Sequence, residues 1–264
     1  MTASKRLRGR PKSFHDKSGQ NRIQALDRAM DVLDCLTQSN GMTLTEIAVK
    51  LEESPATIYR VLSTFNARQV VEVDVATQEW FIGSAAFQIG SAFLRRTDVV
   101  DRARPYMREL MEETGETANL GTEVAGEVMF LSQVETTANI RAFFPPGTKS
   151  PMHASGIGKA ILAHAEGSII EKYVTQKKLE TFTDKTISDA LELRAELEKI
   201  KDQGYAIDDE EKNIGMRCVA APVFNFHGEV IAGISVSGPS QRLSQDSIKS
   251  VCQIVKKKAA LLSG

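Results

Sequence analysis

The sequence predicts an α+β protein with two domains: an N-terminal winged helix-turn-helix, and a larger C-terminal domain of antiparallel strands with helices on one side. Three observations predict it. Residues 23–68 hold three helical segments separated by short turns, the second and third with N-terminal cap signals, followed by two strand-like runs. Residues 117–135 and 217–237 each hold two strand-like runs around a short turn. With 264 residues, 42% of them apolar, the chain can fill two cores.

Composition excludes several classes of protein. No apolar run approaches the roughly 18 residues that span a bilayer, and the basic N-terminus is not followed by the apolar stretch of a secretory signal. The three cysteines, Cys35, Cys218 and Cys252, lack paired metal-binding spacing, so we expect neither a metal nor a cofactor. An odd cysteine count without a CxxC motif favours a reducing cytoplasm.

Residues 1–22 are predicted to be a disordered basic arm. They hold seven basic residues and one acidic residue, which favours a polyanionic partner. Within the arm, Arg8-Gly9-Arg10-Pro11 resembles the core of an AT-hook, so Arg8 and Arg10 are candidates for insertion into an A·T-rich minor groove. The alternative is a generic basic tail.

Residues 23–84, the predicted helix-turn-helix domain, start with two helices. The apolar face of the first is expected to comprise Ile23, Leu26, Met30, Leu33 and Leu36, and Asn40-Gly41 ends it. Thr43 and Glu46 fit a capping box, which predicts that the second helix begins there and runs to about Glu52.

The third helix is expected to begin at Ser54-Pro55, with Ser54 as the N-cap and Pro55 in the first turn. Its predicted buried face comprises Ile58, Val61, Leu62 and Phe65. Its opposite face comprises Thr57, Tyr59, Arg60, Ser63, Thr64 and Arg68. The runs VVEVD and EWFIG follow, joined by residues 76–78, as the two strands of a wing.

This order predicts that the third helix enters the major groove of double-stranded DNA. The candidate DNA-contacting residues are Thr43, Ser54, Thr57, Tyr59, Arg60, Ser63 and Arg68, together with Arg8 and Arg10 of the arm. Residues 23–84 contain four basic and nine acidic residues, so the acids must lie mostly away from DNA. A small helical bundle with another role is the alternative.

Residues 85–98 are predicted to form a linker helix, and residues 99–264 the second domain. In that domain we expect helices near 98–114, 155–164, 168–175, 187–203 and 246–261, and strands near 117–124, 127–135, 205–209, 217–224 and 229–237.

The last two strands suggest a small polar pocket. If they pair as a hairpin around 225–228, with either a two-residue or a four-residue loop, then Cys218, Gly233, Ser235 and Ser237 share one face. The other face carries Val219, Ala221, Val223, Ala232, Ile234 and Val236, which suits a core. A thiol, two hydroxyls and a glycine hollow can form a compact ligand site.

The stretch HASGIGKA, residues 153–160, lies where a helix is expected to begin, and its backbone N–H groups favour an anion. It is not a phosphate-binding loop, because the pattern GxxxxGK[ST] requires Gly at His153 and Ser or Thr at Ala160. A thiol enzyme that pairs Cys218 with His153 is the other possibility. Because none of the four histidines has a recognisable orienting partner, we expect that the protein is not an enzyme.

From Ile23 to Leu262 the chain resembles the IclR family of bacterial transcription regulators. The resemblance rests on TLTEIAVKLEESPATIYRVLSTF, PMHASGIGKAILA, GYAIDDEEKNIGMRCVAAPVF and GISVSGPSQRLS. It implies a winged helix-turn-helix, an effector-binding domain of GAF- or profilin-like topology, and homodimers that often pair into tetramers on palindromic operators.

Within the family the chain looks most similar to the allantoin- and glyoxylate-responsive repressors, and to regulators of glyoxylate assimilation through the β-hydroxyaspartate route. By resemblance, Ser155, Gly156 and Ile157 would hold the carboxylate of a small 2-oxo acid. Asp208, Cys218, Ser235 and Ser237 would hold its aldehyde or hydrate. Ile157 stands where relatives often carry Ala.

The predicted function is therefore a DNA-binding regulator, a repressor, whose operator affinity depends on glyoxylate. Pyruvate or an aromatic acid is the alternative effector. A constitutive architectural DNA-binding protein is an alternative of another class.

Overall fold

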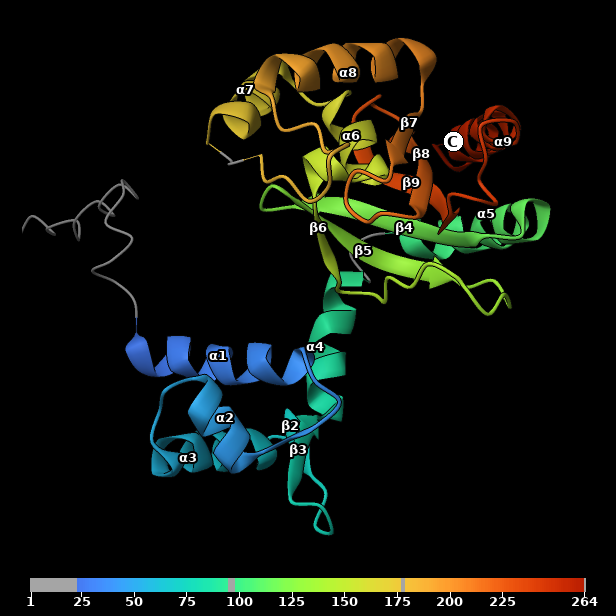
Figure 1. The fold of residues 1–264 in the computed structure, drawn as a ribbon. Helices are drawn as coiled ribbons and strands as arrows, with labels where there is room; N and C mark the ends of the chain where they lie inside the picture. Colours follow the sequence, from blue (N-terminus) through green and yellow to red (C-terminus); the bar gives the residue numbers. More distant parts are fainter. Residues whose placement is uncertain (1–22, 95–97, 177–178, 264) are drawn as a thin grey trace, which may run out of the picture. The chain divides into compact units, whose positions relative to one another are not determined.

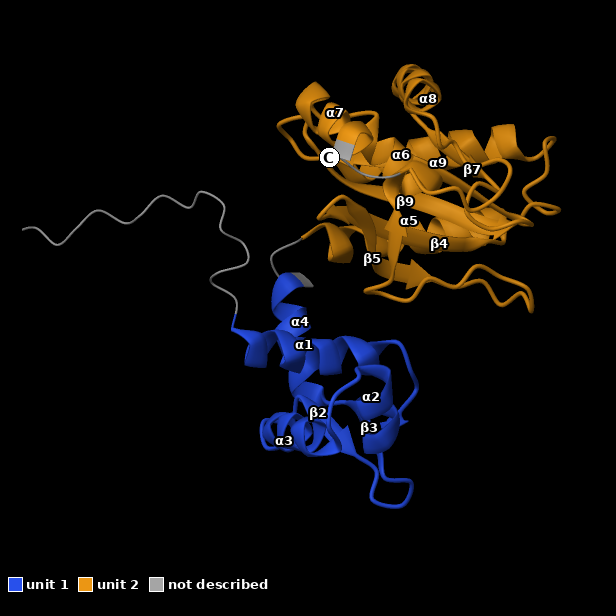
Figure 2. Cartoon of the chain, turned by 60° about the vertical axis from the view of Figure 1, so that its left-hand side comes forward, with its two compact units in different colours: residues 1–93 blue, residues 94–264 orange. Residues whose placement is uncertain are grey.

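The computed structural model describes residues 23–94, 98–176 and 179–263. The chain divides into two compact units, with the boundary between Phe93 and Leu94 (Figure 2). Arg8 and Arg10, the candidate minor-groove residues, lie outside the described residues. No helix in the described part of the chain is long and apolar enough to cross a bilayer.

The N-terminal unit is a winged helix-turn-helix, as predicted (Figure 1). Its elements are α1 (Gln24–Thr37), β1 (Met42–Thr43), α2 (Leu44–Lys50), α3 (Pro55–Asn66), β2 (Val71–Val73), β3 (Glu79–Ile82) and α4 (Ser84–Leu94). The wing is an antiparallel sheet in the order β1-β3-β2. The sequence did not indicate β1, because a strand of two residues has no periodicity of its own.

The predicted caps define the two helices of the helix-turn-helix. Thr43 accepts a hydrogen bond from the backbone N–H of Glu46, and the Glu46 carboxylate accepts one from the backbone N–H of Thr43 at 2.8 Å. The Ser54 hydroxyl accepts from the backbone N–H of Thr57 at 3.1 Å, with Pro55 in the first turn. Each cap satisfies donors that the helix start leaves free.

The predicted apolar face of α1 is wrong over its first half. Ile23, Leu26 and Met30 are 63%, 61% and 55% exposed. The buried positions are Val32, Cys35 and Leu36, which pack with Ile47, Ile58, Leu62 and Trp80. Only the C-terminal half of α1 reaches this core. The apolar periodicity over the whole helix therefore predicted a longer buried face than the structure has.

The C-terminal unit is built around one antiparallel sheet. Its strands, within the described residues, are β4 (Thr117–Val124), β5 (Glu127–Val134), β6 (Lys149–Pro151), β7 (Ala206–Asp209), β8 (Met216–Phe224) and β9 (Val230–Pro239). They lie in the order β6-β5-β4-β9-β8-β7. The short strand β6 was not predicted.

Helices cover both faces of this sheet, whereas the sequence predicted helices on one side (Figure 1). On one face, α5 (Val99–Thr114) and α9 (Ile248–Ser263) pack on apolar residues of β4, β8 and β9. On the other lie α6 (Gly156–Leu162), α7 (Gly167–Gln176) and α8 (Ala190–Gln203). The second layer fits because Gly121 and Gly233 leave a hollow that Ile157 of α6 fills.

The register of the β8–β9 hairpin agrees with the two-residue turn considered from the sequence. Cys218 lies opposite Ser237, and Ala220 lies opposite Ser235. The six apolar residues assigned to the opposite face all belong to the core beneath α5 and α9. The register shifts between Val223 and Phe224. The loop between the two strands, residues 225–229, is therefore longer than two residues.

The close packing of α6 against the Met152 backbone can be tested with Gly158→Ala. A Cβ on Gly158 would lie 2.3 Å from the backbone of Met152, so α6 must move away from the segment before it. We expect a loss of about 2 kcal/mol or more in the free energy of unfolding, typical of a clash against rigid backbone. Denaturant unfolding followed by circular dichroism measures it.

Gly167→Ala is the matched control, because a Cβ at Gly167 would meet no atom within 4 Å. Equal stability of the two variants would show that α6 is not held in this close contact.

Candidate functional site

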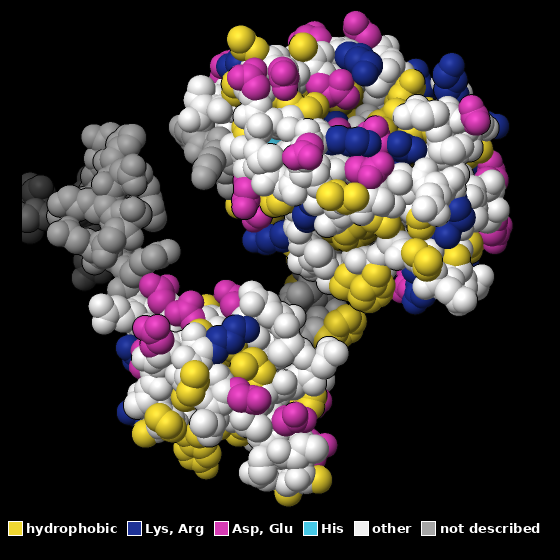
Figure 3. Space-filling model, in the orientation of Figure 1, with side chains coloured by type: hydrophobic (Ala, Val, Ile, Leu, Met, Phe, Trp, Pro, Cys, Tyr) yellow, Lys and Arg dark blue, Asp and Glu magenta, His cyan; other side chains and the backbone are white. Residues whose placement is uncertain are grey.

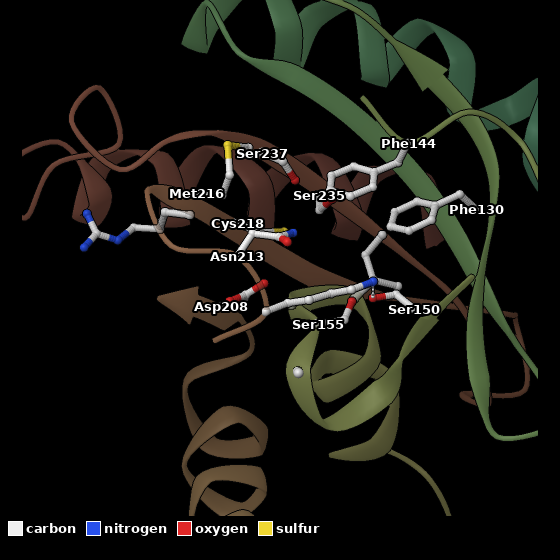
Figure 4. A pocket seen from close by; sticks show the side chains of 15 residues that line it. Phe130, Phe144, Ser150, Ser155, Asp208, Asn213, Met216, Cys218, Ser235 and Ser237 are labelled. Carbon is white, nitrogen blue, oxygen red and sulfur yellow. Dashed lines mark hydrogen bonds between the residues drawn. The ribbon is translucent and has the colours of Figure 1, made fainter. Parts of the chain in front are cut away.

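One cavity of the C-terminal unit brings together the seven predicted effector-site residues. It is lined by Ser155, Gly156, Ile157, Asp208, Cys218, Ser235 and Ser237, and also by Phe130, Phe144, Ser150, Ala154, Lys212, Asn213, Met216 and Arg217 (Figure 4). The volume open to the centre of a water-sized sphere is about 30 Å³. Since one water needs about 10–15 Å³ by this measure, the cavity has room for a compact ligand of a few heavy atoms.

An aromatic pair forms one wall of the cavity. Phe130 of β5 and Phe144 stack with their ring centroids 4.8 Å apart and their planes 9° from parallel. Phe130 is buried and Phe144 half-buried. Neither ring was assigned to the site from the sequence, because residues 135–148 carry no strand or helix pattern that would place Phe144 beside β5.

The two serines of β9 present hydroxyls on the cavity side. Ser235 is fully buried, and its Oγ makes no hydrogen bond of ordinary geometry among the described residues, although the Cys218 thiol lies close enough to act on it. Ser237 Oγ accepts a hydrogen bond from Asn119 Nδ2 at 3.2 Å, and Asn119 Oδ1 accepts one from Gln133 Nε2 at 3.0 Å. The Ser237 hydroxyl therefore keeps its proton for another acceptor. Asn119 could have been found by parity, because it lies opposite Ser235 on β4.

The start of α6 closes the cavity from the side opposite the serines. Ser155 caps the helix by accepting from the backbone N–H of Gly158 at 3.4 Å. A Cβ on Gly156 would lie 2.9 Å from Cys218 Sγ, so only glycine lets the helix start lie this close to the thiol. The Ile157 side chain points into the hollow of Gly121 and Gly233 and occupies the glycine space that the sequence had assigned to the ligand.

Burial changes the acidity of two cavity residues in the same direction. It raises the pKa of the Asp208 carboxyl to about 6, opposed by the hydrogen bond that Asp208 Oδ1 accepts from the Glu211 backbone N–H at 2.8 Å. Burial, with the nearby Asp208 charge, raises the pKa of the Cys218 thiol to about 11. A thiol of that pKa is a hydrogen-bonding group at neutral pH and a poor nucleophile.

His153 does not pair with Cys218. It is buried, with Nδ1 3.0 Å from the Tyr173 hydroxyl and Nε2 3.0 Å from the Glu180 carbonyl oxygen. Burial lowers its pKa. Both ring nitrogens are therefore engaged by Tyr173 and Glu180. Neither is free to accept a proton from the Cys218 thiol, as a thiol enzyme would require.

Lys159, the lysine of HASGIGKA, is a structural ion. It is fully buried, and its Nζ donates to Ile207 O at 2.7 Å and to Glu211 Oε1 at 2.5 Å. Burial raises the pKa of Glu211 to about 7, although Lys159 opposes the rise. The pair ties α6 to β7, which carries Asp208, and to the loop after it, and no pattern in the sequence indicated this pair.

The exposed face of α3 is the candidate DNA interface. Tyr59, Arg60 and Arg68 are exposed, and Thr57 and Ser63 are half-buried. The hydroxyls of Thr43, Ser54 and Thr57 already take part in capping interactions, which gives these three residues a structural role as well.

Acidic side chains gather over α1, where Asp27, Asp31 and Asp34 are exposed (Figure 3). These acids therefore lie on a different helix from Arg60, and Arg68 lies in the turn after α3.

A winged helix-turn-helix and a second unit with a small polar cavity define a DNA-binding transcription regulator with an effector-binding domain. Two family models match: the IclR helix-turn-helix domain over residues 25–75, and the bacterial transcriptional regulator IclR C-terminal domain over residues 91–264. The chain belongs to the IclR family, whose members are regulators and not enzymes.

Relatives support the assignment along the whole chain. The HTH-type transcriptional regulator BhcR of Paracoccus denitrificans is 50% identical, covering 100% of this chain and 95% of its own. The HTH-type transcriptional repressor AllR of Escherichia coli is 34% identical, covering 98% and 95%. The crystal structure of Thermotoga maritima IclR aligns with a TM-score of 0.77 at 29% identity, covering 92% of this chain and 98% of its own.

The acidity of Cys218 gives a direct chemical prediction. A pKa near 11 instead of the ordinary 9.0 leaves about 100-fold less thiolate at pH 7.5, so iodoacetamide should alkylate Cys218 about 100-fold more slowly than a free thiol such as glutathione. Mass spectrometry of the native protein, resolved by peptide and repeated between pH 7 and 10, measures the rate. Alkylation as fast as that of glutathione would overturn this view of the site.

Proposed function

We propose that this regulator is a repressor whose operator affinity is set by glyoxylate, and that it controls glyoxylate-related metabolism. The observation that carries the proposal is the fully buried Ser235 hydroxyl, which has only the Cys218 thiol acting on it and makes no hydrogen bond of ordinary geometry among the described residues, beside a cavity with room for only a few heavy atoms. An unpaired buried hydroxyl is costly unless a ligand supplies its partner. The similarity to BhcR and AllR supports the same branch of the family.

In the proposed complex the effector lies between α6 and the hairpin. Its carboxylate accepts from the backbone N–H groups of Gly156 and Ile157, which have no partner within the helix. Ser237, whose oxygen already accepts from Asn119, donates to the aldehyde end. Cys218 and Asp208 contact the same end, where an ionised Asp208 can accept a hydrogen bond from the hydrated aldehyde, and a bound anion would raise the pKa of Asp208 further and favour its protonated form.

Pyruvate and aromatic acids are the alternative effectors. An IclR homologue from Microbacterium hydrocarbonoxydans, 22% identical, was crystallised with 4-hydroxybenzoate. In the present chain Ile157 and the Phe130–Phe144 stack leave about 30 Å³, too little for a benzene ring without rearrangement. Cavity size therefore favours glyoxylate over an aromatic acid, and only weakly over pyruvate.

Regulation requires that the effector bind two states of the protein unequally. We propose a homodimer or homotetramer on a palindromic operator, in which the linker around α4 changes the spacing of two DNA-binding domains. The division into an arm (1–22), a DNA-binding domain (23–84), a linker (85–98) and an effector-binding domain (99–264) is part of this proposal, as is the cytoplasmic location.

The test is a mobility-shift assay on the DNA upstream of the gene, titrated with glyoxylate, pyruvate and allantoin. Glyoxylate should change the fraction of operator bound at lower concentration than the other two compounds. A complex that no small acid alters at millimolar concentration would instead favour a constitutive architectural DNA-binding protein.

Paired variants separate the two sites. Ser235→Ala and Cys218→Ala should raise the glyoxylate concentration for half-response about tenfold, by loss of one buried hydrogen bond, with operator affinity unchanged. Arg60→Ala should weaken operator binding by about 1–3 kcal/mol and leave glyoxylate binding, measured by calorimetry, intact. The reverse pattern would show that the sites have been assigned to the wrong domains.

A further inference from the structure

Lys212 lines the cavity, although no motif in the sequence marks it as a site residue. It lies in the loop between β7 and β8 and is half-buried. Its Nζ donates to Ser150 Oγ of β6 at 2.9 Å, and Ser150 itself is buried (Figure 4). This hydrogen bond connects the loop after one edge strand, β7, to the other edge strand, β6, at the cavity.

The two lysines near the cavity differ in their charge partners. Lys159 is fully buried and paired with Glu211 at 2.5 Å. For Lys212, no carboxylate of the described residues lies within the 4.0 Å of an ion pair. The carboxylates that act on it from farther away are Asp208 and Glu127. Asp208 accepts from the Glu211 backbone, and Glu127 lies 3.5 Å from the Lys149 ammonium.

A half-buried ammonium without an adjacent anion carries an uncompensated desolvation cost. Consistently, burial lowers the pKa of Lys212. The ammonium has three donors, and Ser150 takes one of them. The remaining donors can bind an anion while the link to β6 stays in place.

We propose that Lys212 is an effector-binding residue whose ammonium pairs with the carboxylate of the ligand, so that the cavity selects compact carboxylates over neutral compounds of the same size. This inference rests on the proposed effector function of the cavity. It explains how an anion is held beside Asp208: the ammonium supplies a positive charge at the cavity that offsets the carboxylate.

The test compares glyoxylate, pyruvate and the neutral aldehyde glycolaldehyde by titration calorimetry on the full chain. Lys212→Met should weaken binding of the acids about 10- to 100-fold, the loss typical of a charge-assisted hydrogen bond, and leave glycolaldehyde unchanged. Lys212→Arg should restore most of the acid affinity. Lys149→Met is the matched control: it removes an equal charge next to Ser150, at a side chain that is half exposed and does not line the cavity.

Each outcome decides a different point. Unchanged acid affinity in Lys212→Met overturns the role of Lys212. Equal loss for glycolaldehyde and the acids, with a lowered melting temperature, shows that Lys212 only ties the loop to β6 and also overturns it. If the wild type binds pyruvate but not glyoxylate, and Lys212→Met loses pyruvate, the glyoxylate assignment fails and Lys212 stands. If the wild type binds none of the acids, both proposals are wrong.

Discussion

The close approach of α6 to the sheet is the constraint on which the effector-binding domain depends. Three contacts allow no larger side chain: Gly156 against Cys218, Gly158 against the backbone of Met152, and the Gly121–Gly233 hollow against Ile157. Together they fix the helix start within reach of the β9 hydroxyls. The cavity is small because these contacts keep α6 and the sheet close together. Its size is therefore set by backbone packing more than by the polar residues that line it.

Charge is arranged around this contact at two levels. In the interior, Lys159 pairs with Glu211 and also donates to Ile207 O, and these contacts hold the end of β7 that presents Asp208. At the cavity, Asp208 and Lys212 act on each other beyond ion-pair distance, so each keeps hydrogen-bonding capacity for a ligand. A buried pair is costly to assemble and more costly to break. The inner pair therefore suits a structural role, and the outer residues suit reversible binding.

The sequence predicted most of the fold and the polar half of the site. Strand parity placed Cys218, Ser235 and Ser237 on one face, because a period of two holds wherever the opposite face is buried. Parity carries no information about what covers that face, so helices on both sides and the filling of the glycine hollow by Ile157 were not foreseen. The helix start at residues 155–157 was also predicted from the sequence, and only Asp208 came from the family resemblance. Lys212, Ser150 and Phe144 come from irregular segments or a very short strand, where no periodicity indicates which residues meet.

The cysteine shows why geometry had to decide between sensor and enzyme. In the sequence, a Cys and a His in neighbouring motifs are compatible with either. In the structure, His153 uses both ring nitrogens elsewhere, and burial holds Cys218 as a neutral thiol. Catalysis by Cys218 needs an activated nucleophile, and this cavity holds the thiol in its neutral form without a base beside it. A neutral thiol, two hydroxyls and a carboxyl of raised pKa can bind a small polar molecule and release it unchanged, which is what reversible control of a DNA-binding domain requires.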